Sequence, residues 1–349
     1  MATFFPVLAM QVTGFLERYN MSERKTTTAS RPGGYTTPAG IDRSQQQAAD
    51  WSTVKLLGDT ANPTHQHVIQ HIQPKYFKQN PDTRLYVGDC REVLPNLPDQ
   101  GGVNLVFADP PFNWEVPYDG WEDNMPRNEF ERFTFDWLDA CINILSPSGA
   151  IWVSIPDDTV AEVVVHLKRR GLTMINWCVW HFRFGQCRDA SFIMSKVHAL
   201  YFVKDPANRV WNPEDILEQS DRATIYNDRR THEKEKNKGM RVPMDVWYGK
   251  YWGRIQGNNK ERRQGHHNQN PEVYLERIIL ACSNEGDLVL DPFAGSGTTG
   301  TVAREHNRRS VGVEHSEINA ESAWERISQI GMVRKNCSFG QSSAIFNKR

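Results

Sequence analysis

The chain has 349 residues, a formal net charge of −1 at pH 7 and a sequence pI near 6.8. This length suits one large α/β domain with an insertion, or two domains, and the charge excludes a uniformly basic nucleic-acid binder, so any basic surface has to be local. No stretch reaches the ~20 apolar residues of a membrane span, and six cysteines without CxxC pairs or a regular spacing with histidine predict reduced thiols, no metal site and a cytoplasmic protein.

The first 81 residues are expected to form a largely disordered extension, because residues 21–81 are rich in Ser, Thr, Gln, Pro and Gly and show little apolar periodicity. After residue 82, apolar runs alternate with turn residues. The pattern predicts strands over 84–87, 103–108, 150–155, 173–180, 198–203, 287–290 and 310–313, and helices over 130–145, 160–170, 271–283, from 298 onward and over 318–330.

Strands that alternate with helices predict an α/β fold whose sheet is mostly parallel, with right-handed crossovers. In such sheets, ligands bind beyond the carboxyl ends of the strands, where the strand order reverses. Four acidic residues fall at or near the ends of predicted strands: Asp89, Asp109, Asp291 and Glu314. We therefore expect four carboxylates to converge on one crevice.

Two short motifs stand out, and their order is unusual. The early one, Asp109-Pro110-Pro111-Phe112, places a carboxylate, a rigid backbone and an aromatic face after a buried strand. The late one, Gly295-Ser296-Gly297-Thr298-Thr299-Gly300, matches GxGxxG and follows the apolar run 288–290. Glycines permit a tight turn and close approach of the backbone to a ligand, and the helix that follows offers free N–H groups.

With the two motifs in this order, the chain resembles the circularly permuted beta group of DNA amino-methyltransferases, which use S-adenosylmethionine as methyl donor. The resemblance covers roughly residues 82–330. It implies a Rossmann-like methyltransferase fold with a mostly parallel seven-stranded sheet and helices on both faces. It further implies a target-recognition insertion at 205–265, a tail at 331–349, double-stranded DNA as partner and a target base flipped out of the duplex.

The resemblance assigns the early motif to catalysis. The exocyclic amine of adenine or cytosine is a poor nucleophile, because its lone pair is delocalised into the ring. Asp109 can accept one N–H bond of this amine and the Pro110 carbonyl the other, while Pro110 and Pro111 fix φ near −65° and Phe112 offers a face for stacking. Taken alone, the Asp-Pro pair is equally typical of a turn that caps a strand.

The same resemblance places the cofactor. Phe293, Gly295 and Gly297 shape the pocket for its methionine part, Asp291 lies under its amino group, and Glu314 accepts from ribose hydroxyls. Asp89 accepts a hydrogen bond from the adenine of the cofactor. The structural alternative for Asp89 is a helix or turn cap, and the alternative for Glu314 is an acid on the surface. The segment 267–271 resembles the motif before the glycine strand, except that the family usually has Lys or Arg in place of Asn270. The predicted cofactor residues are Asp89, Asn268, Gln269, Asp291, Phe293, Gly295, Ser296, Gly297, Thr298 and Glu314.

A basic segment lies between the two motifs. Residues 229–265 contain eleven Lys and Arg against four Asp and Glu, a difference of +7, together with four Trp and Tyr residues. Such side chains neutralise phosphates and reach bases, although a charged run in isolation is more often a solvated loop. The predicted DNA contacts are Arg229, Arg230, Lys250, Arg254, Arg262 and Arg263.

Adenine N6 is the favoured target, because the resemblance associates serine at the first motif position with N4-cytosine enzymes; cytosine N4 stays open as the alternative. Methylation at cytosine C5 is not expected, since no cysteine follows a proline. A nicotinamide-dependent oxidoreductase would need a second nucleotide-binding half, and only 35 residues follow Glu314. A P-loop is excluded because no Gly-Lys-Ser/Thr follows the glycine turn. A non-catalytic DNA-binding module would not need Asp-Pro-Pro-Phe. A homodimer and a restriction partner are left open.

Overall fold

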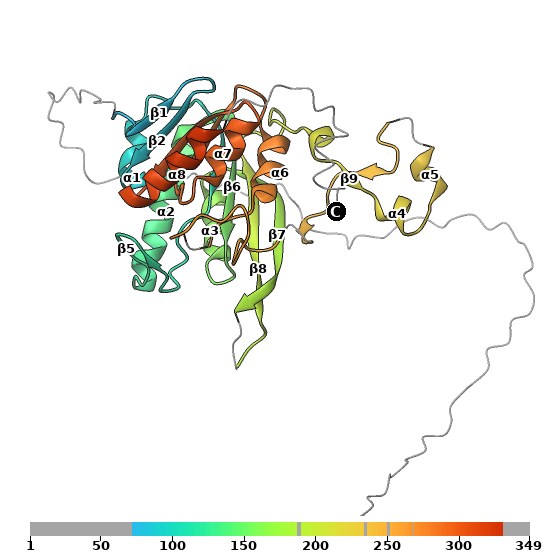
Figure 1. Ribbon diagram of the computed structural model, residues 1–349, viewed down its shortest axis with the longest axis horizontal. Helices are drawn as coiled ribbons and strands as arrows, with labels where there is room; N and C mark the ends of the chain where they lie inside the picture. The colour runs from blue at the N-terminus through green and yellow to red at the C-terminus, as the bar shows by residue number, and fades with distance from the viewer. Residues whose placement is uncertain (1–71, 187–189, 234–235, 250–251, 267, 331–349) are drawn as a thin grey trace, which may run out of the picture. The chain divides into compact units, whose positions relative to one another are not determined.

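The computed structural model describes residues 72–186, 190–233, 236–249, 252–266 and 268–330 (Figure 1). Within them, nine strands form one sheet in the order β1-β2-β13-β12-β3-β6-β8-β7-β11. The strands are β1 (Tyr76–Lys78), β2 (Thr83–Val87), β3 (Val103–Ala108), β6 (Leu145–Ile155), β7 (Thr173–Gln186), β8 (Met194–Val203), β11 (Val246–Trp247), β12 (Leu288–Asp291) and β13 (Arg309–Glu314). Strand β8 is antiparallel to both neighbours and β1 to β2, while every other pair in this sheet is parallel.

This is the mostly parallel, Rossmann-like sheet that the sequence predicts. Its seven longer strands match the seven expected, and the two short strands β1 and β11 extend its edges. All residues of β3 except Asn104 are buried, as expected for a central strand covered on both faces.

Helices cover the sheet in two groups. They are α1 (Cys90–Val93), α2 (Arg127–Ile144) and α3 (Val160–Arg169) on one side, and α6 (Glu272–Cys282), α7 (Thr298–Glu305) and α8 (Glu317–Gln329) on the other. Helix α2 contacts both α1 and α3, and α7 contacts both α6 and α8, so each group forms a continuous layer (Figure 1).

The strand order reverses between β3 and β12. These two strands are neighbours, but the chain continues from β12 to β13 on one side and from β3 to β6 on the other. Crossover connections leave the carboxyl ends of such a pair uncovered, which creates a crevice for a ligand. The motif that follows β3 and the glycine turn that follows β12 therefore meet at this point.

Several predicted boundaries differ from the structure: β7 continues to Gln186, β8 begins at Met194 and α2 begins at Arg127. Two further differences affect how the elements join. The turn-like run 146–149 does not separate α2 from β6, because β6 already begins at Leu145 and its pairing with β3 is irregular there. The extension predicted for residues 1–81 ends earlier, because β1 pairs with β2 and the Arg304 guanidinium donates to the carbonyls of Asn80 and Pro81. Residues 1–71 and the predicted tail at 331–349 lie outside the described residues.

The segment 205–265 forms small local elements rather than a second core. They are η4 (Pro213–Ile216), β9 (Glu218–Gln219), α4 (Asp221–Thr224), α5 (Arg229–His232), β10 (Met240–Arg241) and the edge strand β11. Arg277 of α6 fastens this segment: it donates to Glu218 at 3.2 Å, and its guanidinium lies 4.3 Å from the ring centroid of Trp252.

Candidate active site

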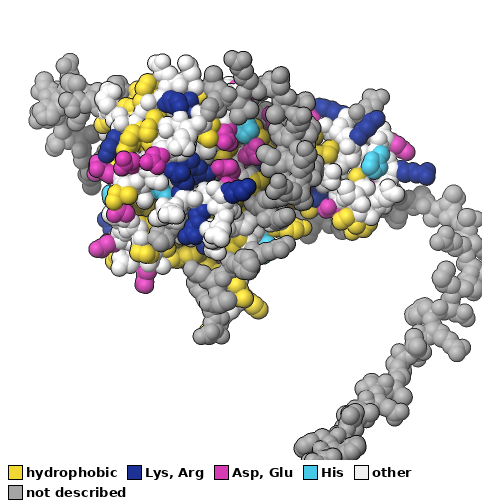
Figure 2. Space-filling model, in the orientation of Figure 1, with side chains coloured by type: hydrophobic (Ala, Val, Ile, Leu, Met, Phe, Trp, Pro, Cys, Tyr) yellow, Lys and Arg dark blue, Asp and Glu magenta, His cyan; other side chains and the backbone are white. Residues whose placement is uncertain are grey.

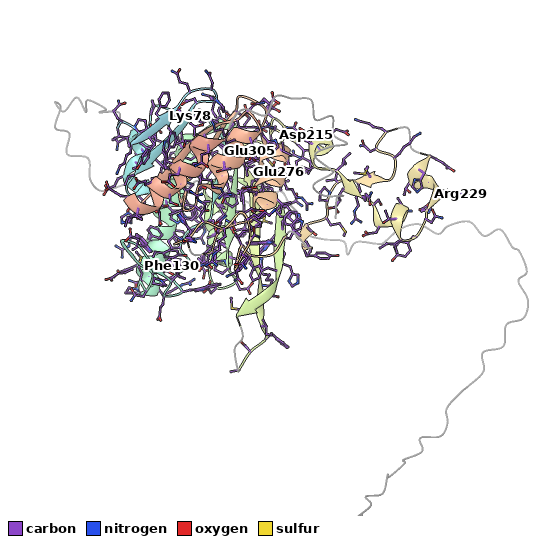
Figure 3. The ribbon with its side chains drawn as sticks, viewed as in Figure 1. Lys78, Phe130, Asp215, Arg229, Glu276 and Glu305 are labelled. Carbon is purple, nitrogen blue, oxygen red and sulfur yellow. The ribbon has the colours of Figure 1, made fainter. Side chains whose placement is uncertain are left out.

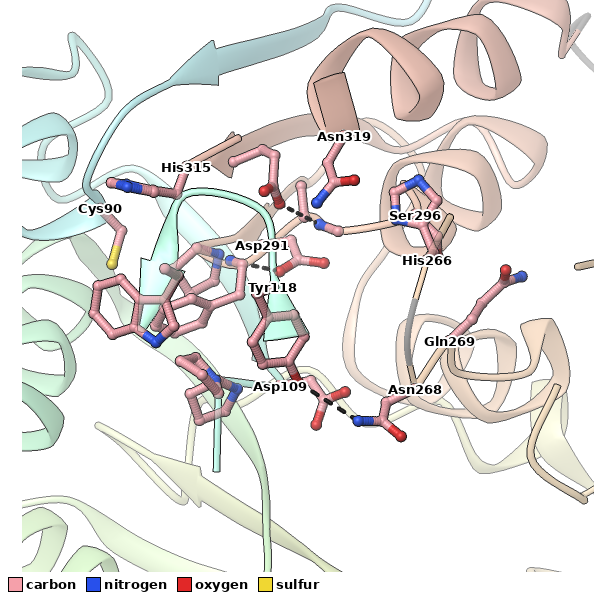
Figure 4. A pocket seen from close by; sticks show the side chains of 18 of the residues that line it. Cys90, Asp109, Tyr118, His266, Asn268, Gln269, Asp291, Ser296, His315 and Asn319 are labelled. Carbon is pink, nitrogen blue, oxygen red and sulfur yellow. Dashed lines mark hydrogen bonds between the residues drawn. The ribbon is translucent and has the colours of Figure 1, made fainter. Parts of the chain in front are cut away.

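A cavity of about 430 Å³ opens at the carboxyl ends of β2, β13, β12 and β3 (Figure 4). This volume is in the range of small-molecule and cofactor sites. All four acidic residues singled out from the sequence line it: Asp89, Asp109, Asp291 and Glu314. The crevice expected from strand order therefore exists, and it contains residues of both motifs.

Asp291 is the last residue of β12 and is almost fully buried. Its Oδ1 accepts from the Phe293 N–H at 2.9 Å, and its Oδ2 accepts from the Thr299 hydroxyl at 2.5 Å. Both donors are neutral, so burial dominates and raises the pKa of Asp291 to about 7. A buried carboxylate held only by neutral donors is suited to receive a cationic group from a ligand.

Glu314, the last residue of β13, fixes the glycine turn. Its Oε2 accepts from the Gly295 N–H at 2.8 Å, and its Oε1 accepts from the Ser316 N–H at 3.0 Å. Burial raises the pKa of this carboxyl above its usual range. The surface-acid reading of Glu314 is therefore wrong: this side chain lies at the cavity wall and orders the turn.

Gly297 lies behind the turn rather than on the cavity wall. Its φ is +72°, and a Cβ atom there would come within 3.0 Å of the Ala323 Cβ on α8. The residue therefore allows α8 to pack closely and contributes in this way to the shape of the turn. Ser296 and Thr298 do line the cavity, and their hydroxyls lie 3.0 Å apart.

Asp89 caps a helix and lines the cavity at once. It is the N-cap of α1, where Oδ1 accepts from the Arg91 N–H at 2.8 Å, and it pairs with the Arg91 guanidinium at 2.6 Å. This hydrogen bonding to Arg91 lowers the pKa of Asp89 despite the opposing effect of burial. Asp89 is therefore a helix cap, and its carboxylate stays ionised at the edge of the cavity.

Asp109 directly follows β3, and Pro110, Pro111 and Phe112 line the cavity beside it. Its Oδ2 accepts from the Asn270 side-chain amide at 2.8 Å. Desolvation raises the pKa of Asp109 to about 6, against the opposing effect of this hydrogen bond. The carboxylate is thus a weakly solvated acceptor that is ionised above this pH.

The loop after Phe112 is shaped by a residue that the sequence reasoning missed. The buried Asp123 accepts from the backbone N–H groups of Asn113, Trp114 and Val116 at 2.8 to 3.2 Å. The short hairpin of β4 (Pro117–Tyr118) and β5 (Trp121–Glu122) follows, and Tyr118 and Trp121 line the cavity. Other cavity residues that were not predicted as site residues are Asp119, Asn270, Thr299, His315 and Asn319. Of these, Asn270 and Thr299 stand in motifs recognised from the sequence, at 267–271 and 295–300.

The residues of the predicted motif at 267–271 make different kinds of contact. Asn268 donates to the Tyr118 hydroxyl at 3.5 Å and accepts from Arg254 at 3.2 Å. The buried Gln269 uses its amide within the protein, because Nε2 donates to the Glu261 carbonyl at 2.7 Å and Oε1 accepts from the Arg263 N–H at 2.9 Å. Gln269 therefore orders the loop before α6. These two hydrogen bonds also fix its position at the cavity wall. His267 lies outside the described residues.

The six residues predicted to contact DNA differ in exposure and in their partners within the protein. Arg229 on α5 and Arg262 are exposed (Figure 3 labels Arg229), whereas the guanidinium of Arg230 pairs with Asp228 at 3.0 Å. Arg263 donates to the Ser322 carbonyl at 3.1 Å and is partly buried against α8. Arg254 lies over the ring of Phe182, 4.2 Å from its centroid, and close enough to Asp109 to lower the pKa of that carboxyl. Lys250 lies outside the described residues.

Among the described helices, none combines the length and the apolar character that a membrane span requires. No cluster of His, Cys, Asp and Glu within the described ranges could hold a metal ion.

A family model described as DNA methylase, for N6 and N4 methyltransferases, matches residues 103–325. The chain belongs to this DNA methylase family. Type II methyltransferase M.HpaI of Haemophilus parainfluenzae is 30% identical over 248 residues, which cover 70% of this chain and 74% of that protein. DNA adenine methyltransferase YhdJ of Escherichia coli (strain K12) is 32% identical over 260 residues, covering 71% and 82%. Members of this DNA methylase family use S-adenosylmethionine as methyl donor, so this chain is an S-adenosylmethionine-dependent DNA methyltransferase.

The fold of this DNA methylase is found in a solved relative. The PvuII DNA methyltransferase, described as cytosine-N4-specific, superposes with a TM-score of 0.56 at 17% identity, covering 79% of this chain and 94% of the other. Identity this low shows a common fold and nothing about the target base.

The burial of Asp291 predicts a pH-dependent cost to stability. Because its pKa is raised from 3.8 to about 7, the folded protein binds a proton that the unfolded chain releases, and the free energy of unfolding should fall as pH rises from about 4 to 7. Asp291→Asn removes this cost. We expect the variant to gain up to a few kcal/mol over wild type at pH 8, because each pH unit between the unfolded and folded pKa values corresponds to about 1.4 kcal/mol, and to gain little at pH 4. Urea unfolding without cofactor at both pH values measures the difference; an equal effect at both would contradict it.

Proposed function

We propose that the chain is an adenine-N6 methyltransferase that acts on double-stranded DNA by base flipping and direct in-line transfer. The observation that carries this proposal is the junction of two parts in one cavity: the Asp109 loop after β3 and the Asp291 turn after β12. One part suits an amine with two N–H donors, and the other suits a cationic cofactor. Residues 82–330 would form the methyltransferase domain and 205–265 its target-recognition segment.

The cavity residues fit S-adenosylmethionine. The buried Asp291 carboxylate, held by neutral donors, would pair with the ammonium group, and Phe293, Gly295, Ser296 and Thr298 would enclose the methionine part. Glu314 and Asp89 would accept from the ribose and the adenine. When bound, the cofactor supplies an electrophilic methyl group on a sulfonium.

The residues of the early motif would prepare the target amine. Asp109 accepts one N–H bond and the Pro110 carbonyl the other, which favours tetrahedral nitrogen and releases the lone pair for attack. Phe112, which is buried and lies edge-on to Trp114 with ring centroids 5.2 Å apart, offers its face to the base. Asp109 need not be a strong base, because the nitrogen becomes acidic once it carries the methyl group.

Adenine is favoured over cytosine by two considerations. The first motif residue is aspartate, a full anionic acceptor, and YhdJ, which matches 71% of this chain, is described as an adenine methyltransferase. Both amines present two N–H donors, so cytosine N4 is the competing product in the test.

Loss of the Asp109 carboxylate should separate chemistry from cofactor binding. In Asp109→Ala we expect methyl transfer to fall by at least about 100-fold, the scale of losing one preorganised transition-state contact. Binding of S-adenosylmethionine, measured by calorimetry, should stay within a few-fold, because the proposed partner of its ammonium group is Asp291 and not Asp109. Near-normal turnover by this variant would overturn the mechanism.

The base assignment has a direct measurement. We expect DNA that has been incubated with the protein and labelled S-adenosylmethionine, then digested to nucleosides, to yield N6-methyl-2′-deoxyadenosine as its labelled nucleoside. N4-methylcytosine as the main product would overturn the choice of base and leave the fold and the cofactor unaffected.

Among the described members of the predicted DNA set, Arg229, Arg230 and Arg262 are exposed; Arg230 is already paired with Asp228, so Arg229 and Arg262 are the two chosen for replacement. Lys and Arg side chains also lie on the part of the surface that carries α4 and α5 (Figure 2). Replacing both arginines by glutamine should weaken DNA binding and reduce the log–log salt slope by about 0.9 for each lost phosphate contact. Arg169→Gln is the matched control, because Arg169 is an exposed arginine at the carboxyl end of α3 and lies outside the 205–265 segment. Equal slopes for the double variant and the control would place the DNA surface elsewhere.

A further inference from the structure

Asn270 contacts the proposed catalytic carboxylate directly. Its side-chain Nδ2 donates to Asp109 Oδ2 at 2.8 Å, although the two residues are 161 positions apart in the sequence. Both line the cavity. The contact joins the early motif after β3 to the 267–271 segment before α6.

The backbone around Asn270 is held firmly. On one side, Gln269 is buried and bonds with both amide atoms to the loop at 261–263. On the other side, Pro271 is the N-cap of α6, and the next residue's N–H is held by Glu261 Oε2 at 2.9 Å. Asn270 is therefore a preorganised donor, and the Asp109 carboxylate is the acceptor it holds in place.

The charged and titratable groups around Asp109 come from several elements. Arg254 is a nearby cation, but its guanidinium is engaged by Asn268 and by the face of Phe182. Asp291 of β12 is close enough for mutual repulsion. The hydroxyls of Tyr118 and Tyr274 approach from the β4–β5 hairpin and from α6, respectively. The Asn270 amide donates a short, neutral hydrogen bond to the carboxylate at 2.8 Å.

We propose that Asn270 is the positioning residue for Asp109: it holds Oδ2 and thereby directs Oδ1 toward the target amine. This inference rests on the proposed function of Asp109. A cation at this position would neutralise the carboxylate that has to accept from the amine. A neutral amide fixes the carboxylate geometry and leaves its negative charge available to the substrate.

If Asn270 positions Asp109, variants of Asn270 should differ in the pH dependence of methyl transfer. Asn270→Ala removes the donor, so Asp109 becomes harder to ionise, whereas Asn270→Lys supplies a charged donor. Under single-turnover conditions with saturating cofactor and DNA, the acid limb of the rate profile should move upward by roughly one pH unit in Asn270→Ala and downward in Asn270→Lys. At pH 7 the rate of Asn270→Ala should fall roughly 10- to 100-fold from misplacement of the carboxylate.

Two further measurements distinguish positioning from a general structural effect. Cofactor affinity by calorimetry and the thermal midpoint should change little in Asn270→Ala, because Asn270 has no contact with the Asp291 turn in the proposed role. Asn270→Asp keeps the shape of the side chain and provides a second variant if Asn270→Ala does not fold; it should also move the acid limb upward. Equal acid limbs in wild type and in every folded variant would overturn the inference.

The inference and the proposed function fail in different ways. In the Asp109→Ala background, adding Asn270→Ala should cause no further loss, since Asn270 would act through Asp109 alone. Activity retained by Asp109→Ala itself contradicts the proposed function. An inactive Asp109→Ala together with a fully active Asn270→Ala and an unchanged pH profile contradicts only the role of Asn270.

Discussion

The structure depends on one constraint: two carboxylates, Asp109 and Asp291, are kept in a poorly solvated cavity where the strand order reverses. Burial raises the pKa of both, to about 6 and about 7, so each costs stability when ionised. Neither carboxylate has a lysine or arginine bonded to it among the contacts of the described residues; their short bonds come from Asn270, Thr299 and the Phe293 N–H. Such a site is unfavourable for the free protein and favourable for a ligand that brings positive charge and N–H donors.

The surrounding elements keep these two carboxylates in place. Parallel pairing of β3 with β12 sets the two strand ends side by side, and Glu314 at the end of the next strand fixes the glycine turn above Asp291. The buried Asp123 shapes the loop after Phe112 through three backbone N–H groups. Arg277 then anchors the 205–265 segment beside the cavity by packing on aromatic rings. The cavity and the 205–265 segment are thus attached to the same sheet.

The strands and the crevice at their ends were predictable from the sequence, because both follow from the spacing of apolar residues along the chain. Buried apolar runs defined the strands, and acids at their ends predicted the shared crevice. Contacts that depend on folding were not predictable: a charge count cannot show that Arg230 pairs with Asp228, that Arg263 packs on α8 or that Arg254 stacks on Phe182. The close approach of α8 to Gly297 and the bond from Asn270 to Asp109 likewise join residues far apart in the chain.

The most direct test of the central claim uses a bisubstrate analogue in which adenine N6 is joined to the methyl position of the cofactor. If one cavity holds the cofactor against Asp291 and the target amine against Asp109, the analogue should bind roughly 100-fold more tightly than the cofactor alone. Asp109→Ala should remove that gain and leave binding of the cofactor part intact. An analogue that binds no more tightly than the cofactor, or a gain that survives Asp109→Ala, would contradict the account.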